Sequence, residues 1–272
     1  MANESESRRW NDPGWAGSWP KREQLTAGVT PYLLKAIDAR GGQRICDIGS
    51  GGGVLALALA PEVEPAGEVV GLDISAPLTE LATQRAVDAG VTNARFVQMD
   101  VQTDGFDGAA PFDMAVSQFG VMFFDEPTKA FTSVRRLLRP GGRLVFACWQ
   151  SVERNPWHTA TALRGMLPAP PTPAPGKSPV GPFALGDDEY VGEILEAAGF
   201  TGVQATPYSI TLQGAAEAVV DVSLLSFMGV PPDRLDDALG LVTRHLAQFS
   251  AGEDRFDYPL AFWIVEATAP AA

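Results

Sequence analysis

Apolar residues occur along the chain in two alternating patterns. Short apolar runs bounded by glycine, proline or polar residues are typical of buried strands, and longer segments between them repeat apolar residues at helical spacing. The expected strands are residues 44–49, 67–74, 94–101, 114–117, 143–150, 201–212 and 258–270. The expected helices are residues 22–37, with a break near Pro31, and residues 53–63, 76–90, 125–142 and 187–200.

Strands and helices that alternate at this spacing predict a doubly wound α/β fold. Each strand, helix and following strand form a right-handed crossover, so the strands run parallel and helices cover both faces of the sheet. Gly90 is expected to end one helix, and the Pro-Gly-Gly sequence at 140–142 is expected to turn the chain into the next strand.

Several segments depart from this alternation. Residues 1–20 are polar but contain three tryptophans, which a disordered tail rarely carries, so part of this segment is expected to dock on the fold. Residues 151–167 are expected to be partly helical. Residues 168–183 carry proline at seven positions, which predicts an extended loop that is either a surface spacer or a lid. Residues 213–250 are expected to be helical.

Charge and cysteine usage narrow the class of protein. The chain has 33 acidic and 20 basic residues, and a surface of net charge -13 disfavours nucleic acid and anionic membranes as partners. Cys46 and Cys148 lie in apolar runs, which predicts buried, reduced thiols. Neither His158 nor His245 has cysteines nearby at zinc-ligand spacing. Residues 1–15 carry charges but no apolar segment, which argues against a signal peptide, and the longest apolar run, residues 53–63, is too short to span a bilayer. We therefore expect a cytoplasmic protein.

The sequence RICDIGSGGG, residues 44–53, ends a buried strand in a run of glycines. Glycine in the first turn after a strand lets the backbone bend sharply and approach a ligand closely. Gly49, Gly51 and Gly53 therefore predict a ligand cradle; a merely tight turn would explain one glycine but not four. The spacing differs from the dinucleotide pattern G-x-G-x-x-G, because Val54 stands at the sixth place.

An aspartate lies at or near the end of each of the first three expected strands. Asp47 would be a poor neighbour for a pyrophosphate and suits a cationic amine. Asp73 is placed to accept both hydroxyls of a ribose, and Asp100 to meet an adenine amino group. A single such aspartate is often only a helix cap or turn residue. Three in series favour a binding site.

With these motifs in place, residues 44–150 resemble the core of class I S-adenosylmethionine-dependent methyltransferases. They are most similar to the small-molecule group that includes the ubiquinone and menaquinone C-methyltransferases and many natural-product methyltransferases. The matching pieces are ICDIGSGGG, VVGLDIS, ARFVQMDV, FDMAVSQFGVMFF and LLRPGGRLVFACW. The resemblance implies a Rossmann-like seven-stranded sheet whose last strand is antiparallel, and S-adenosylmethionine as cofactor.

The resemblance also implies roles for individual residues. The methionine part of the cofactor would contact Asp47, Gly49, Ser50, Gly51 and Gly53. The ribose and adenine would contact Asp73, Ile74, Asp100 and Val101, and the pocket would be closed by Ser117 and Gln118.

The implied organisation has four parts. Residues 1–40 would form an N-terminal cap segment and residues 41–150 the cofactor-binding core. Residues 151–185 would form a proline-rich lid. Residues 186–272 would complete the core, with a helical insert at 213–257 between two strands that usually form a near-hairpin. The cap segment, the lid and the insert are expected to cover the substrate.

Methyl transfer requires mainly that a nucleophile be aligned with the methyl group and that water be excluded. His158 is the candidate general base, with a partly exposed helix histidine as the alternative. Trp19, Phe119 and Trp157 are the candidate substrate contacts, although such aromatics are more often core residues. No metal is expected.

We therefore predict transfer of a methyl group to an O, N or C atom of a small, mostly apolar metabolite, in secondary or quinone-like metabolism, by a monomer or homodimer. The alternatives are an NAD-dependent oxidoreductase, or a protein of this fold that binds the cofactor without transferring a methyl group.

Overall fold

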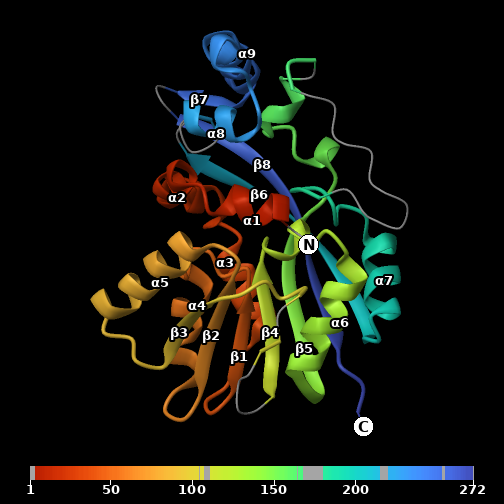
Figure 1. The fold of residues 1–272 in the computed structure, drawn as a ribbon. Coiled ribbons are helices and arrows are strands. Elements are labelled where there is room, and N and C mark those ends of the chain that lie inside the picture. The colour runs from red at the N-terminus through yellow and green to blue at the C-terminus, as the bar shows by residue number, and fades with distance from the viewer. Residues whose placement is uncertain are drawn as a thin grey trace.

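A mixed sheet organises the chain, with strand order β3-β2-β1-β4-β5-β8-β6 (Figure 1). The computed structural model describes residues 4–103, 105–106, 111–163, 165–167, 180–214, 220–252 and 255–271. The strands are β1 (Arg44–Ile48), β2 (Glu68–Asp73), β3 (Ala94–Gln98), β4 (Phe112–Gln118), β5 (Leu138–Trp149), β6 (Thr201–Gly214), β7 (Ser250–Gly252) and β8 (Arg255–Thr268).

The direction of the strands confirms the predicted fold class. β1 pairs in parallel with both β2 and β4, and β4 pairs in parallel with β5. β8, the last strand, lies antiparallel between β5 and β6. The short strand β7 pairs only with β8 and adds to the seven expected strands. Because the strand order reverses between β1 and β4, their carboxyl ends are where an open α/β sheet binds ligands.

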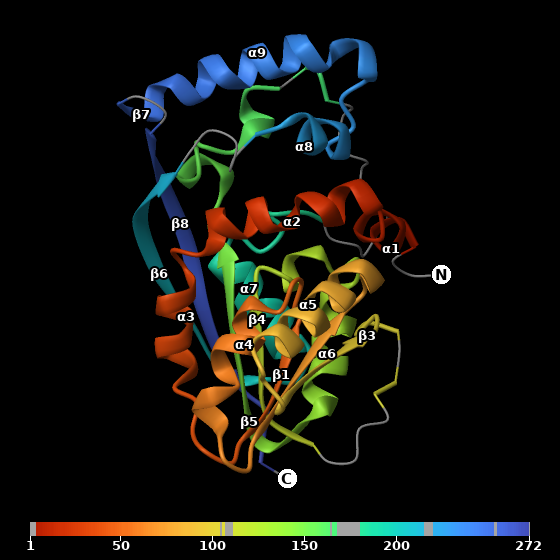
Figure 2. The same ribbon diagram turned by 90° about the vertical axis from the view of Figure 1, so that its left-hand side faces the viewer.

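Helices cover both faces of the sheet, with α3, α4 and α5 on one face and α6 and α7 on the other (Figures 1 and 2). Their caps follow the sequence: the Ser75 hydroxyl accepts from the Leu78 amide at the start of α5, and Gly90 follows α5 with φ +66°. The helices are α1 (Glu4–Trp10), α2 (Pro13–Thr26), α3 (Thr30–Ile37), α4 (Val54–Leu59), α5 (Ala76–Asp88), α6 (Pro127–Leu137), α7 (Asp188–Ala197), α8 (Val222–Phe227) and α9 (Leu235–Leu246).

The N-terminal segment is more helical than the pattern predicts. The expected helix 22–37 is divided between α2 and α3, and Pro31 lies in the first turn of α3, where proline is favoured. Most of α2 precedes the expected start, with the Asp12 side chain capping its first turn. Trp15 and Trp19 of α2 line a cavity. The rest of the helix is mostly polar or small, so the spacing of apolar residues does not predict it.

Two strands have other bounds than expected. β3 ends at Gln98 rather than 101, because Met99 donates its amide to the Asp73 carbonyl and the Asp100 side chain accepts from the Gln102 amide in an Asx turn. β5 begins at Leu138 rather than 143, so the Pro-Gly-Gly sequence forms an irregular start of the strand, and its register against β4 shifts there.

The segment after β5 is less helical than expected. Within 151–163 and 165–167 the chain forms short 3-10 turns, Val152–Arg154 and Thr159–Thr161. Pro156 cannot continue a helix, and the buried Asn155 amide bonds to the Gln150, Ser151 and Ala261 carbonyls. Residues 168–179, most of the expected proline-rich loop, lie outside the described residues.

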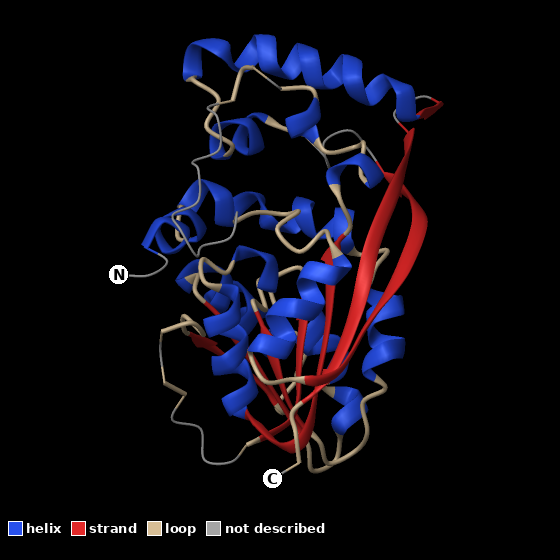
Figure 3. Ribbon diagram, turned by 90° about the vertical axis from the view of Figure 1, so that its right-hand side faces the viewer, coloured by secondary structure: helices blue, strands red, loops and turns tan. Residues whose placement is uncertain are grey.

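The long strands β6 and β8 form an antiparallel pair that extends well past the rest of the sheet (Figure 3). Their pairing continues to Gly214 and Phe256, so the insert between them begins and ends closer to its tip than the expected bounds of 213 and 257. α8 and α9 belong to this insert and lie above the carboxyl ends of the parallel strands, with α2 between α8 and the sheet (Figures 1 and 2).

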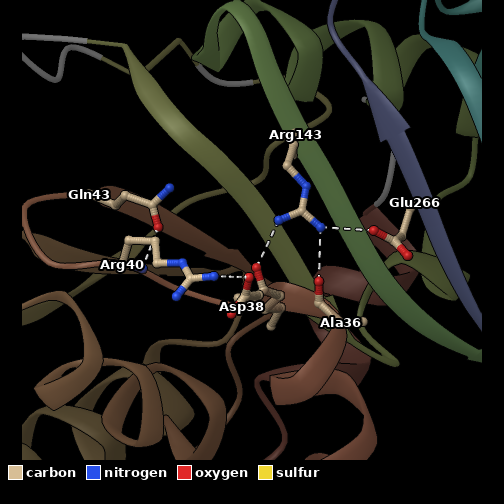
Figure 4. A network of polar contacts seen from close by, with 7 residues as sticks. Ala36, Asp38, Arg40, Gln43, Arg143 and Glu266 are labelled. Carbon is tan, nitrogen blue, oxygen red and sulfur yellow. Dashed lines mark hydrogen bonds and ion pairs between the residues drawn. The ribbon is translucent and has the colours of Figure 1, made fainter.

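At the opposite end of the sheet, Arg143 fixes the end of α3 to two strands (Figure 4). Its Nη1 donates to the Ile37 carbonyl at 2.8 Å, and its Nη2 donates to the Ala36 carbonyl and Glu266 Oε2, both at 2.8 Å. The carbonyls in the last turn of a helix lack partners within the helix, so this guanidinium satisfies groups that α3 itself cannot. The nearby pair of Arg40 and Asp38 lies in solvent.

Replacement of Arg143 with Met is expected to lower the free energy of unfolding by about 1–3 kcal/mol, because three charge-assisted hydrogen bonds are lost. Arg40→Met removes the same charge from an exposed pair and is expected to change stability by less than about 0.5 kcal/mol. Urea unfolding of both variants measures the difference. Equal losses would show that Arg143 contributes only its charge.

Candidate active site

A cavity of about 290 Å³ lies at the carboxyl ends of the parallel strands, beneath α1 and α2. Its floor comes from the turns after β1, β2, β3 and β4, and its roof from the N-terminal helices. One side is formed by the segment that follows β5. This position agrees with the rule for open α/β sheets, since the strand order reverses between β1 and β4.

Most of the residues singled out from the sequence line this cavity. They are Trp19, Asp47, Gly49, Ser50, Gly51, Asp73, Ile74, Asp100, Val101, Gln118, Phe119, Trp157 and His158. Gly53 and Ser117 do not line it.

The glycine turn after β1 depends on the absence of side chains. Gly49 has φ +67°, and a Cβ there would lie 2.7 Å from the Cα of Gly120 in the turn after β4. Gly51 has φ +52°, and a Cβ there would lie 2.9 Å from the Trp19 ring. Both residues thus need a backbone conformation that favours glycine and a contact closer than any side chain allows.

Gly53 and Ser117 support the site from behind, which differs from their expected place on the pocket surface. Gly53 precedes α4 with φ +82°, and a Cβ there would lie 2.8 Å from the Phe96 ring, so its glycine is required by packing. The fully buried Ser117 hydroxyl donates to the Ile48 carbonyl at 2.6 Å and accepts from the Gly120 amide at 3.2 Å. It joins the two turns that form the floor.

Asp73, at the end of β2, holds the glycine turn in place. Its Oδ2 accepts from the Gly51 amide at 2.7 Å and its Oδ1 from the Ser75 amide at 2.8 Å. Burial raises the pKa of this carboxyl, against the effect of the two amide bonds. Each carboxylate oxygen can accept a further hydrogen bond, so Asp73 remains able to bind hydroxyls.

Asp47 is the most unusual group in the cavity. It is only 1% exposed, and neither carboxyl oxygen has a hydrogen-bond partner. Burial raises the pKa of Asp47 to about 8, and the charge of Asp73 acts in the same direction. A buried acid without a partner is costly, and a cationic group would relieve that cost. Asp47 is therefore suited to hold an amine.

The turns after β3 and β4 complete the floor. Asp100 lies two residues beyond β3 and Val101 next to it is buried. Gln118 ends β4; its Nε2 donates to the Thr26 carbonyl at 3.4 Å, whereas its buried Oε1 has no partner. The Ile74 carbonyl accepts from the Asn11 side chain at 3.2 Å.

Aromatic rings form one wall of the cavity. Phe119 has φ +66°, a conformation that costs energy in a bulky residue and is typical of functional sites. Its ring stacks on Trp149 with the centroids 4.0 Å apart, and Trp149 contacts Trp157 at 5.3 Å. The Asn155 Oδ1 accepts from the Trp157 indole at 3.1 Å and fixes its orientation.

His158 follows this wall and begins a 3-10 turn rather than lying on a helix. Its Nδ1 accepts from the Ala160 amide at 3.3 Å, and its ring contacts Phe183 at 4.8 Å. Burial lowers the pKa of His158 to about 4, so the imidazole is neutral at pH 7. Because Nδ1 accepts a hydrogen bond, the ring proton is assigned to Nε2.

Two sets of contacts fasten the N-terminal helices over the cavity. The Asn11 side chain bonds to Ile74 and to the Ala76 amide. Arg85 of α5 forms a two-pronged pair with Glu23 of α2, 2.8 Å for each bond, and also donates to the Gly52 carbonyl. Asn11, Glu23 and Arg85 were not singled out in the sequence. Only the three tryptophans of this segment indicated that it docks.

None of the helices in the described part of the chain combines the length and apolar composition that crossing a bilayer requires. No group of three or more His, Cys, Asp or Glu side chains within it is arranged to hold a metal ion. Both cysteines are free and buried, as expected.

Known proteins match this chain both in sequence and in fold. A family model described as a methyltransferase domain matches residues 39–199, which is more than half of the chain. The ubiquinone/menaquinone biosynthesis C-methyltransferase UbiE of Stutzerimonas stutzeri is 36% identical over 115 residues, 42% of this chain and 44% of that protein. The aklanonic acid methyltransferase DauC of Streptomyces sp. is 33% identical over 105 residues, 39% of this chain and 47% of that protein.

The match therefore spans less than half the length of these curated relatives. Among solved structures, the YcgJ protein of Bacillus subtilis matches with a TM-score of 0.61 at 20% identity, covering 89% of this chain and 98% of that chain. This likeness shows the same fold.

The buried acid Asp47 leads to a prediction about stability. An unfolded aspartate titrates near 3.8, so between about pH 4 and pH 8 the folded protein holds a proton that the unfolded chain has lost. The contribution of Asp47 to stability therefore falls as pH rises through this range. Asp47→Asn is expected to abolish that loss, so its stability relative to the unchanged protein should rise between pH 5 and pH 8 by about 3–4 kcal/mol.

Urea unfolding of both proteins at the two pH values measures this difference. If the two stability curves stay parallel from pH 5 to pH 8, Asp47 is ionised in the folded protein and its environment is other than described.

Proposed function

We propose that this chain, which belongs to the methyltransferase domain family, transfers a methyl group from S-adenosylmethionine to a small, mostly apolar metabolite. The single observation that carries the proposal is the buried, unpartnered Asp47 carboxyl beside a glycine turn that leaves room for a ligand. The cofactor has a cationic amine, a ribose and an adenine, and the floor of the cavity offers a suitable group for each.

The residues that would hold the cofactor are those that line the floor. Asp47 would accept the amine, and Gly49, Ser50 and Gly51 would lie along the methionine part. Asp73 would accept the ribose hydroxyls with the lone pairs left after its two amide bonds. The adenine would contact Ile74, Asp100 and Val101, and Gln118 would close the pocket. When bound, the cofactor supplies an electrophilic methyl group.

The remaining residues would orient the acceptor and exclude water. Phe119, Trp149 and Trp157 present a continuous aromatic surface, which favours a flat, apolar molecule. Trp19 covers the glycine turn from above. Holding the acceptor atom in line with the methyl group is worth roughly 7–11 kcal/mol of the barrier in well-oriented reactions. The names of the two relatives, which refer to quinones and to aklanonic acid, support an aromatic, polyketide-like or isoprenoid acceptor.

His158 is the proposed general base for an O or N acceptor. It is neutral at pH 7, as a base must be, and it lines the cavity next to Trp157. Its Nδ1 accepts from the Ala160 amide, so to take up a proton the ring has to release that bond or exchange its tautomer.

The residues of the glycine turn fit an NAD-dependent oxidoreductase less well than a methyltransferase. Asp47 stands where a pyrophosphate would have to pass, and Val54 replaces the third glycine of the dinucleotide pattern. Binding of the cofactor without methyl transfer remains the alternative that an activity assay must exclude. The cytoplasmic location and the monomeric or dimeric state stay predictions.

S-Adenosylhomocysteine is expected to bind the purified protein with micromolar affinity, and NAD is expected not to bind. Asp73→Ala should weaken this binding by roughly tenfold to a hundredfold, because both the ribose contact and the support of Gly51 are lost. Asp233→Ala, an exposed acid on the insert, is the control. Calorimetric titration measures both variants. NAD binding in place of S-adenosylhomocysteine would move the protein to another class.

His158→Gln is expected to reduce turnover by about 10²–10⁴-fold with an O or N acceptor while leaving affinity for S-adenosylhomocysteine unchanged. Above about pH 5 the unchanged protein should show no loss of rate attributable to His158, since the base form persists until the pH approaches its pKa of about 4. Transfer of a radiolabelled methyl group to a panel of phenols and quinols measures turnover. An undiminished rate would remove His158 as the base.

A further inference from the structure

Arg22 is a buried cation at the roof of the cavity. It lies on α2 and is only 9% exposed. Its stripe on the helix is shared by Trp15 and Trp19, which also line the cavity, and its guanidinium lies 5.6 Å from the Trp15 ring centroid. Arg22 therefore belongs to the same surface as the tryptophans that cover the site.

The hydrogen bonding of Arg22 is incomplete. Nη2 donates to Asp221 Oδ1 at 2.5 Å, but Nε and Nη1 are buried and have no hydrogen-bond partner. An arginine fork has five donors, and leaving buried donors without acceptors is costly. A ligand that brings an acceptor to Nε and Nη1 would remove this cost.

Within the described part of the chain, no other residue of the cavity accepts a hydrogen bond from Nε or Nη1 of Arg22. The lining is otherwise rich in acids, so a basic side chain stands out there. Among the described residues that line the cavity, Arg22 is the one lysine or arginine, whereas five acids share the lining: Glu6, Glu23, Asp47, Asp73 and Asp100. Glu23 is already paired with Arg85, and Glu6 accepts from the Trp10 indole. Among the described residues of the lining, Arg22 is therefore the one side chain whose charge suits an anionic group of a ligand.

We propose that Arg22 binds a carboxylate of the ligand that occupies the cavity, and exchanges its bond to Asp221 for that carboxylate. The inference rests on the proposed function only in that the cavity is the active site. Two molecules could bring this carboxylate: the amino-acid end of the cofactor, or the methyl acceptor. In both cases the guanidinium of Arg22 would turn from Asp221 and donate to the two oxygens of the carboxylate side by side, the geometry that arginine is suited to.

Asp221 makes this exchange possible. It caps α8, with its Oδ1 accepting from the Leu224 amide at 2.8 Å as well as from Arg22. When Arg22 turns away, Asp221 keeps that helix bond and its other contacts with solvent, since it is less buried than Arg22. The pair joins α2 to the insert between β6 and β8, so occupation of the cavity would also loosen the roof from the insert.

The test compares two pairs of probes that differ only in a carboxylate. The first pair is S-adenosylhomocysteine and its decarboxylated form, which keeps the amine. The second is 2-naphthoate and the neutral 2-naphthamide. Calorimetric titration with Arg22→Met should show at least tenfold weaker binding of the carboxylate in one pair, with its neutral counterpart within twofold. The pair that responds identifies whether the cofactor or the acceptor meets Arg22.

Two further variants keep the test decisive. Arg234→Met removes the same charge from an exposed pair on the insert and should alter neither pair of probes. Asp221→Asn frees Arg22 from its counter-charge and should strengthen binding of the same carboxylate severalfold, which tests the proposal even if Arg22→Met does not fold. Circular dichroism and thermal melting report the fold of each variant.

Equal effects on charged and neutral probes in both pairs, or no effect of either variant, would overturn the proposal and leave Arg22 a structural link to the insert. Binding of decarboxylated S-adenosylhomocysteine to the unchanged protein separates this outcome from failure of the proposed function. If that compound binds and Arg22 does not discriminate, the function stands and only the role of Arg22 falls.

Discussion

The close approach of the turns after β1 and β4 is the constraint on which the site depends. A Cβ on Gly49 would lie 2.7 Å from the Gly120 Cα, and a Cβ on Gly120 would lie 2.7 Å from the Ile48 carbonyl, so only two glycines allow this contact. The buried Ser117 hydroxyl bonds to both turns and holds them together. Phe119, which directly precedes Gly120, has a left-handed φ of +66°, and its ring stacks on Trp149. The cofactor floor and the aromatic wall are thus parts of one arrangement.

Around this floor the protein buries ionisable groups without fully satisfying them. Neither Asp47 oxygen forms a full hydrogen bond, Asp73 accepts from two backbone amides, and Nε and Nη1 of Arg22 have no acceptor. Burial of such groups costs free energy, which a ligand of complementary charge would relieve. The distribution is not random, because the acids lie on the strand ends and the arginine lies on the roof. A zwitterionic molecule would therefore bind with a defined orientation.

The N-terminal helices convert an open sheet edge into an enclosed cavity. Asn11 and the pair of Arg85 with Glu23 attach them to the same turns that form the floor. Their tryptophans Trp10, Trp15 and Trp19 add apolar surface to a cavity whose floor carries several acids. The roof is thus fastened both by these polar contacts and by aromatic packing, such as that of the Trp10 ring of α1 on Phe123.

Local patterns in the amino-acid sequence are enough to predict the order of strands and helices, the parallel core and the floor of the site. These features follow from local patterns: buried apolar runs, a glycine turn, and acids at strand ends that a parallel sheet brings to one edge. The tertiary structure alone decided that Gly53 and Ser117 support the site from behind and that Asp100 lies in a turn beyond β3. It also joined Arg22 to Asp221, residues on α2 and at the start of α8. Contacts between distant segments leave no periodic signal, because their geometry depends on how whole elements pack.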